Sequence, residues 1–245
     1  MIIFMTSLLA GNYKQFMKIP YQGVNEDNGL VENLRKVWSI DARCLFVASQ
    51  PDNYQMADNL GKEAYARVRT SGLSCQSLAI CDHRDMDCAA SLDNYDVIIL
   101  SGGHVPTANA FLHEIGLKEK LVDFKGILIG ISAGSMNQAK EVYAQPEEQG
   151  EPSNPDYVKF LPGLGTTDIS VLPHYQVLKN EIVDGMRLFE DVTYKDSMGR
   201  KFYAIEDGTY ILIKDGKTTV YGAAYLLEDG KLSQICKKDQ QLEIK

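Results

Sequence analysis

The sequence predicts an α/β fold in which a mostly parallel sheet is covered by helices on both faces. Short runs of β-branched and other apolar residues alternate with segments whose apolar residues recur every three to four positions. This alternation is typical of βα units, whose parallel strands are buried on both faces. The chain has 245 residues, 44% hydrophobic and 24% charged, which suits a single α/β domain over residues 1–245.

The first half of the chain carries most of this pattern. The expected strands are residues 2–7, 44–48, 74–81, 97–100 and 127–131. Helical spacing predicts helices that begin near residues 30, 54 and 106. Residues 11–29, which contain Gly, Asn and Pro, are expected to form an irregular excursion. Ligands of parallel sheets bind beyond the C-terminal ends of the strands, so the residues after 97–100 and 127–131 are candidates for a site.

The pattern changes after residue 139. Residues 141–155 are polar and proline-containing, and we expect an exposed loop there. Apolar residues at positions 178, 182, 186 and 189 predict one more helix. Between residues 202 and 227, strand-like runs are separated by Asp207–Gly208 and Asp215–Gly216, and Asp-Gly pairs are typical of hairpin turns. We therefore expect C-terminal β-hairpins.

Charge and cysteine content exclude several classes of partner. The formal net charge of −8 argues against binding to nucleic acids or anionic membranes. No apolar run approaches the roughly 20 residues of a membrane span, and the first residues lack the basic segment of a secretory signal. The five cysteines are odd in number and form no CxxC pair, which indicates a reduced, cytoplasmic protein.

Residues 130–134, Gly-Ile-Ser-Ala-Gly, match the G-x-S-x-G pattern of a nucleophile elbow. A strand that turns sharply into a helix holds its serine in a strained conformation, and Gly130 and Gly134 leave room for that turn. The N-terminus of the following helix would face developing negative charge at Ser132. The alternative is a tight turn that carries an ordinary serine.

A serine nucleophile needs a base, and the chain has four histidines: His83, His104, His113 and His174. Only His174 follows Ser132, and it stands after Pro173 at the end of an expected strand. His113 fits a solvated helix surface. His83 lies among cysteines whose spacing does not match a zinc site, so we expect no metal there.

The remaining groups of a serine hydrolase also have candidates. The acid that orients His174 could be Asp156 or Asp168, in the order Ser-acid-His, or Glu206 or Asp207, in the order Ser-His-acid. Oxyanion donors could be the N–H of Ala133 and an N–H of the Gly102–Gly103 pair.

Four segments in this order resemble the peptidase E (aspartyl dipeptidase) family of serine peptidases, over roughly residues 95 to 225. They are Leu-Ser-Gly-Gly-His at 100–104, Gly-Ile-Ser-Ala-Gly at 130–134, Leu-Pro-His-Tyr at 172–175 and Ala-Ile-Glu-Asp-Gly-Thr-Tyr at 204–210. The resemblance implies a three-layer α/β sandwich of the class I glutamine amidotransferase-like (flavodoxin-like) type.

The resemblance also implies roles for individual residues. Ser132 becomes the nucleophile, His174 the base, and the N–H groups of Gly103 and Ala133 the oxyanion donors. Alignment on Gly208 places Asp207 at the position of the family's catalytic glutamate, and Glu206 lies one residue before it. The implied activity is hydrolysis of small peptides through an acyl-enzyme, without a cofactor, by a monomer or homodimer.

The sequence departs from the family pattern at several positions. His104 stands where asparagine is usual, and Ser101 replaces a glycine. Aspartyl specificity in the family depends on a basic residue beyond the histidine, where this chain offers only Lys179 and Arg187. Two alternatives therefore stay open: a cyanophycinase-like hydrolase, and a non-catalytic amidotransferase-like binding module. Glutamine amidotransfer is not expected, because that chemistry uses a cysteine at the elbow.

Overall fold

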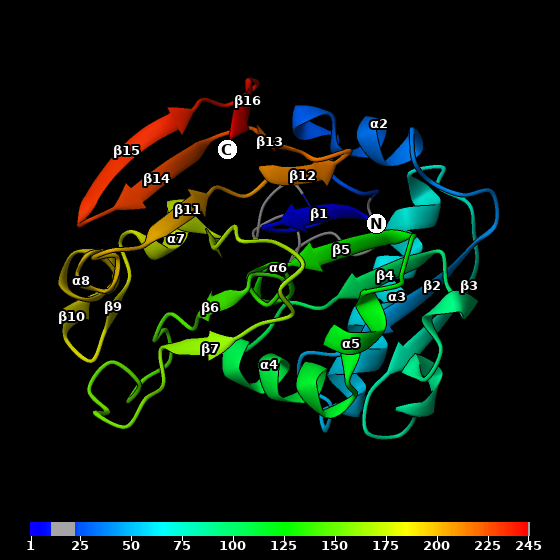
Figure 1. Ribbon diagram of the computed structural model, residues 1–245, viewed down its shortest axis with the longest axis horizontal. Helices are drawn as coiled ribbons and strands as arrows, with labels where there is room; N and C mark the ends of the chain where they lie inside the picture. Colours follow the sequence, from blue (N-terminus) through cyan, green and yellow to red (C-terminus); the bar gives the residue numbers. More distant parts are fainter. Residues whose placement is uncertain (11–22, 245) are drawn as a thin grey trace.

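The computed structural model describes residues 1–10 and 23–244, and its centre is an eight-stranded sheet (Figure 1). The strand order is β16-β13-β12-β1-β5-β4-β2-β3. Five strands are parallel: β1 (Ile2–Thr6), β5 (Ile127–Ile131), β4 (Val97–Leu100), β2 (Ala42–Val47) and β3 (Cys75–Cys81). The other three are antiparallel to their neighbours: β12 (Tyr210–Lys214), β13 (Lys217–Tyr221) and β16 (Gln241–Ile244). The predicted mostly parallel α/β sheet is confirmed.

Helices pack on both faces of the sheet because its central strands are apolar on both sides. In β4, Ile98 and Leu100 face the core that contains α4 (Val105–Glu114) and α5 (Leu117–Leu121). Val97 and Ile99 face the opposite core, which contains α2 (Leu30–Arg35) and α3 (Tyr54–Thr70). All four strand residues are buried, as alternating side chains of a doubly covered sheet must be.

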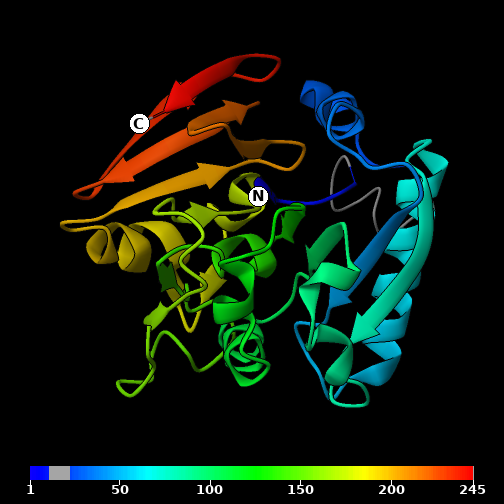
Figure 2. The same cartoon turned by 45° about the vertical axis from the view of Figure 1, so that its right-hand side comes forward.

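A second sheet of four strands lies at the other end of the molecule from β2 and β3 (Figures 1 and 2). Its order is β15 (Lys231–Cys236), β14 (Ala224–Glu228), β11 (Lys201–Ile205) and β8 (Val171–Leu172). Hairpins join β12 to β13 and β14 to β15. In the first of these, Asp215 and Gly216 both have positive φ (52° and 74°), as a two-residue hairpin turn requires.

The expected hairpin at Asp207–Gly208 is wrong. β11, before it, pairs with β14 and β8, whereas β12, after it, pairs with β1 and β13. The chain therefore crosses from one sheet to the other between residues 205 and 210. An Asp-Gly pair permits a tight turn, but pairing partners elsewhere in the chain decide where the strands go.

Two further expectations are corrected. The predicted helix through residues 178–189 is interrupted: α7 (Tyr175–Leu178) is followed by a small hairpin of β9 (Ile182–Val183) and β10 (Met186–Arg187). Positive φ values at Asp184 (52°) and Gly185 (76°) turn the chain there. A π-helical segment (Leu188–Thr193) and α8 (Tyr194–Asp196) come next. The expected exposed loop at 141–155 begins as a strand, β6 (Glu141–Tyr143), which pairs with β7 (Phe160–Pro162), and it stays buried through Pro146.

The remaining elements are short. Single 3₁₀ turns lie at Asp27–Gly29, Asp87–Ala89 and Leu92–Asn94. Most of the expected excursion at 11–29 lies outside the described residues. Among the residues that are described, no helix combines the length and apolar composition that crossing a membrane requires.

Candidate active site

The nucleophile elbow lies where β5 ends and α6 (Ala133–Met136) begins. Ser132 has φ 49° and ψ −114°, a conformation that a residue with a side chain rarely adopts. Backbone bonds hold it there: the Ser132 N–H donates to the Thr6 carbonyl (2.9 Å), and the Ser132 carbonyl accepts from the N–H of Ser135 (2.8 Å). The sharp turn expected from the sequence is present.

The two glycines of the motif allow α6 to pack tightly. A Cβ on Gly134 would overlap the backbone carbonyl of Leu100 in β4, and a Cβ on Gly130 would lie 2.6 Å from the Ser135 backbone nitrogen. The helix is only one turn long. The helix N-terminus expected to face Ser132 is therefore that of a single turn, and its contribution comes from the first-turn N–H groups.

His174 and Ser132 are brought into contact although they lie 42 positions apart in the chain. His174 directly follows the strand end at Leu172–Pro173 and has a left-handed backbone (φ 59°, ψ 25°) at the start of α7. Its Nε2 is 2.9 Å from Ser132 Oγ, which is hydrogen-bond distance.

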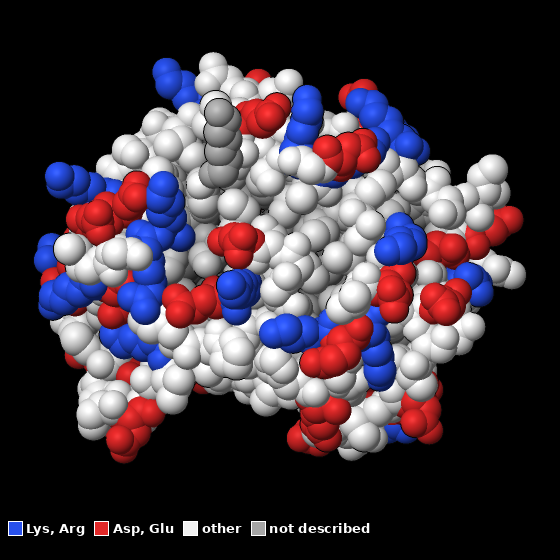
Figure 3. All heavy atoms as spheres, viewed as in Figure 1, with Lys and Arg blue, Asp and Glu red and all other residues white. Residues whose placement is uncertain are grey.

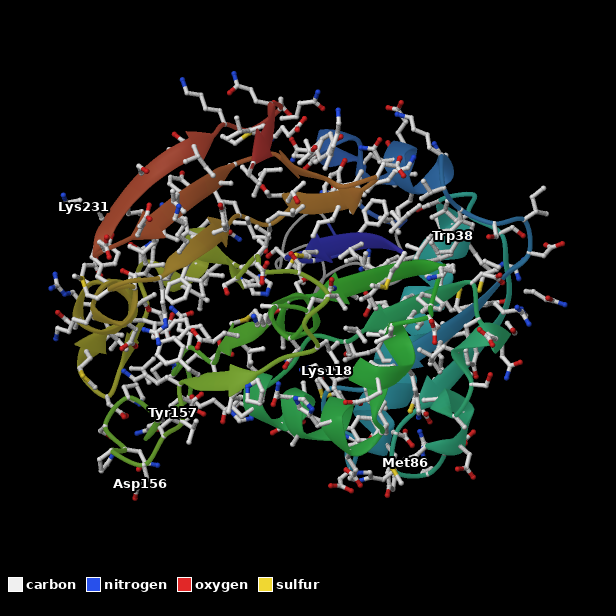
Figure 4. The ribbon with its side chains drawn as sticks, viewed as in Figure 1. Trp38, Met86, Lys118, Asp156, Tyr157 and Lys231 are labelled. Atoms are coloured by element: carbon white, nitrogen blue, oxygen red, sulfur yellow. The ribbon has the colours of Figure 1, made fainter. Side chains whose placement is uncertain are left out.

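Of the four candidate acids, the structure places Asp207 beside the histidine. Asp207 Oδ1 is 2.7 Å from His174 Nδ1, and the Asp207 side chain is only 3% exposed. Glu206 instead accepts a hydrogen bond from Tyr225 Oη (3.1 Å). Asp156 lies in the loop between β6 and β7, far from α6 (Figure 4). Asp168 lines a separate groove with Lys140 and Arg200.

Ser7, which the sequence reasoning missed, joins this group. It follows β1 directly and is fully buried. Its Oγ donates to Asp207 Oδ1 (2.6 Å), lies 3.1 Å from His174 Nδ1, and accepts the backbone N–H of His174 (3.0 Å). A small polar residue at the C-terminal end of a central parallel strand is the signal that could have pointed to it.

The Gly102–Gly103 pair ends β4 next to the elbow. Ser49 Oγ (2.6 Å) and Ser101 Oγ (3.1 Å) both donate to the Gly102 carbonyl, and these bonds hold the peptide that carries the Gly103 N–H. In a trans peptide the N–H points opposite to the C=O, so this N–H is directed away from Ser49. Gly103 has φ 153°, and a side chain there would overlap Ser49. In the part of the chain that the structure describes, the N–H groups of Gly103 and Ala133 have no hydrogen-bond partner.

A cavity of about 580 Å³ opens on Ser132 and His174. One wall is apolar and is formed in part by α3; it comprises Leu8, Leu9, Phe46, Met56, Leu60 and Ala64. Four glutamates also line the cavity: Glu63, Glu147, Glu148 and Glu181. Among the described residues that line it, Arg67 is the one Lys or Arg, and its guanidinium pairs with Glu63 (2.6 Å).

The charged side chains in the described part of the lining are therefore predominantly acidic. Surrounding protein atoms, together with the carboxylates of Glu151 and Glu148, raise the pKa of Glu147. The basic residues proposed for an aspartyl pocket lie elsewhere. Lys179 Nζ makes a cation–π contact with the Tyr175 ring, and Arg187 forms a salt bridge with Asp191 (2.9 Å).

His104 anchors the loop that carries these glutamates. Its Nε2 is 2.9 Å from Glu151 Oε1, and its Nδ1 is 2.7 Å from Thr107 Oγ1. Its possible ligand atom and those of Glu148 and Glu151 lie within 4.8 Å of one another, which is close enough to hold a cation. The hydrogen bond between His104 and Glu151 already accounts for their orientation. His83 pairs with Asp52 and Glu114 rather than with the nearby cysteines.

Comparisons with known proteins bear on this arrangement. The fold is similar to a crystal structure of a peptidase from an acI-B1 Actinobacterium (TM-score 0.64, 15% identity, covering 99% of this chain and 96% of that one). It is also similar to a protein described as a candidate peptidase E from Listeria monocytogenes EGD-e (TM-score 0.57, 17% identity, covering 89% of this chain and 96% of that one). No curated protein matches the sequence. The family model of peptidase family S51 matches residues 41–221, which include the elbow, His174 and Asp207. The chain therefore belongs to peptidase family S51 and is a serine-type peptidase.

Proposed function

We propose that Ser132, His174 and Asp207 form the catalytic triad and that the enzyme hydrolyses small peptides through an acyl-enzyme. The observation that carries the proposal is the continuous chain of contacts, 2.9 Å from Ser132 Oγ to His174 Nε2 and 2.7 Å from His174 Nδ1 to Asp207 Oδ1. Nucleophile, base and orienting acid in that sequence are the working parts of a serine hydrolase.

The mechanism follows from this order of groups. His174 Nε2 takes the proton of Ser132 as Oγ bonds to the peptide carbonyl carbon. The N–H groups of Gly103 and Ala133 would stabilise the resulting oxyanion. His174 then donates the proton to the leaving nitrogen, the C–N bond breaks, and an ester on Ser132 remains. Water, deprotonated by His174, attacks the ester carbonyl carbon; the bond to Ser132 Oγ then breaks, His174 returns the proton to Oγ, and the acid is released. Asp207 stabilises the imidazolium in both halves.

Cavity size and charge support a particular range of substrates. A volume of about 580 Å³ suits a short peptide rather than a folded chain. Among the described lining residues, four glutamates and one arginine that pairs with Glu63 favour neutral or basic side chains over aspartate. On the face shown in Figure 3, basic and acidic side chains are mixed, so this face offers no broad surface for a polyanion.

A fluorophosphonate probe, which reacts with activated serines, tests the triad. We expect the wild type to be labelled and to cleave members of a dipeptide library, and Ser132→Ala to do neither. Ser91→Ala, a change at an exposed serine outside the site, serves as the control. The proposal is wrong if Ser132→Ala retains peptidase activity, or if the wild type is not labelled and cleaves no peptide.

One alternative keeps a specific observation in its favour. The acidic cavity lining would also suit a cyanophycinase-like hydrolase that acts on an aspartate–arginine polymer, so that polymer belongs in the substrate set.

The strand order and the elbow after β5 support the finer inference of a class I glutamine amidotransferase-like, three-layer fold. A non-catalytic module is disfavoured, because family S51 consists of peptidases and Ser132 lies within hydrogen-bond reach of His174.

A further inference from the structure

We infer that Ser7 is a positioning residue of the site, which fixes Asp207 and His174 relative to each other and to the elbow. This inference rests on the proposed triad. Ser7 is not among the described residues that line the cavity at Ser132, and its hydroxyl bonds to His174 and Asp207, so it acts through these two residues.

The hydrogen atoms of the cluster can be assigned by counting donors and acceptors. Ser7 Oγ carries one proton, and an ionised carboxylate only accepts, so the 2.6 Å contact means that Ser7 donates to Asp207 Oδ1. Ser7 Oγ then has only lone pairs left for His174. It accepts the backbone N–H of His174 (3.0 Å) and can face Nδ1 only if Nδ1 carries the ring proton.

This assignment leaves His174 in the tautomer that a general base needs. With the proton on Nδ1, shared between Asp207 Oδ1 at 2.7 Å and Ser7 Oγ at 3.1 Å, the lone pair of Nε2 faces Ser132 Oγ. Asp207 Oδ1 accepts from both Ser7 and His174 at once, and this fixes the rotation of the carboxylate. The Ser7 hydroxyl therefore supports the acid, the tautomer and the ring orientation together.

Ser7 also supports the His174 backbone, which adopts a left-handed conformation (φ 59°) that is unfavourable for a side-chain-bearing residue. The bond from the His174 N–H to Ser7 Oγ holds the chain where the imidazole can reach the elbow.

The neighbour of Ser7 links the same strand end to the nucleophile. The Thr6 carbonyl accepts the N–H of Ser132 (2.9 Å) and the hydroxyl of Ser135 (2.8 Å). Two consecutive residues at the end of β1 therefore hold the two halves of the site. Thr6 binds Ser132, and Ser7 binds His174 and Asp207. Both are fully buried, so water cannot substitute for these contacts without rearrangement.

The test is Ser7→Ala, measured with the best peptide from the library. We expect kcat to fall about 10- to 100-fold, the loss typical of a slightly misplaced catalytic group, with KM unchanged. Ser197→Ala is the matched control, since Ser197 is equally buried and makes two hydrogen bonds, to Tyr194 and Gly230, away from the site. It should lower thermal stability without changing kcat.

A double-mutant cycle separates positioning from a general structural effect. If Ser7 acts through Asp207, Ser7→Ala should cost little in an Asp207→Asn background. Proton NMR gives a readout without turnover: the His174 Nδ1–H resonance should move in Ser7→Ala and stay in place in Ser197→Ala. Ser7→Cys is measured in case the alanine variant does not fold, because cysteine has a similar side-chain volume and a weaker hydrogen-bond donor. Its kcat should lie between that of the wild type and that expected for Ser7→Ala.

Two results would overturn the inference. The first is a kcat equal to that of the wild type in folded Ser7→Ala, or in Ser7→Cys if the alanine variant does not fold. The second is an equal loss of kcat from Ser7→Ala in the wild-type and Asp207→Asn backgrounds. Either result leaves the proposed triad intact as long as Ser132→Ala is inactive. An active Ser132→Ala would instead overturn the proposed function itself.

Discussion

Asp207 Oδ1 lies 2.7 Å from His174 Nδ1, while the carboxylate of its sequence neighbour Glu206 accepts a hydrogen bond from Tyr225. The two acids are adjacent in the sequence, but the backbone between β11 and β12 crosses from one sheet to the other and directs them apart. Of the two, it is Asp207 that lies within hydrogen-bond distance of the His174 ring.

Replacing each acid by its amide distinguishes them. Asp207→Asn should lower kcat about 10³- to 10⁴-fold, because the amide cannot stabilise the charged imidazole and favours the wrong tautomer. Glu206→Gln should leave kcat close to the wild-type value. Steady-state kinetics on one peptide substrate measure both, and a larger loss in Glu206→Gln would refute the assignment.

Ser49 should affect the rate through the oxyanion site. Ser49→Ala removes the shorter of the two side-chain hydrogen bonds to the Gly102 carbonyl (2.6 Å, against 3.1 Å from Ser101 Oγ) and leaves space beside Gly103. Loss of an oxyanion donor typically lowers kcat by about 10²- to 10³-fold. A donor that is present but less firmly oriented should therefore lower kcat about tenfold, with little change in KM. Ser91→Ala again serves as the control. An unchanged kcat would show that the Gly103 N–H is held in place without Ser49.

The cavity glutamates should set the charge preference of the enzyme. Glu147→Gln removes one negative charge beside the site, and at about 4 Å in water such a charge is worth about 1 kcal/mol, or roughly fivefold. The ratio of kcat/KM for lysine-containing over aspartate-containing dipeptides should fall by about that factor. Glu119→Gln, on α5 and outside the cavity, is the matched control. An equal shift in both variants would point to net charge rather than to the site.

His83 should make stability depend on pH. Hydrogen bonds to Asp52 and Glu114 raise the pKa of His83 above its ordinary value of 6.5. A raised pKa means that the folded state holds the proton more tightly, so this stabilisation is complete below pH 6.5 and is lost as pH rises through the raised pKa. His83→Gln should therefore lower Tm at about pH 6 and have less effect at about pH 8.5. Thermal melts at the two pH values check this, and an equal loss at both would contradict it.

Local patterns in the sequence predicted much of the fold. The apolar run of β4, buried on both faces, and the helical spacing of α3 need only their own residues to be recognised. The helix expected over 178–189 failed because positive φ values at Asp184 and Gly185 break a pattern that spacing alone suggested. The hairpin expected at Asp207–Gly208 failed because strand pairing is decided by partners distant in the chain.

The sequence by itself determined the elbow at Ser132, because G-x-S-x-G after a buried strand is a local steric requirement that Gly130 and Gly134 meet. It also singled out His174, the one histidine after the serine. Only the tertiary structure decided between Asp207 and Glu206 and brought Ser7 beside them. These choices depend on how β1, β8 and the β11–β12 crossover meet in space, and a single sequence does not record contacts between residues 7, 174 and 207.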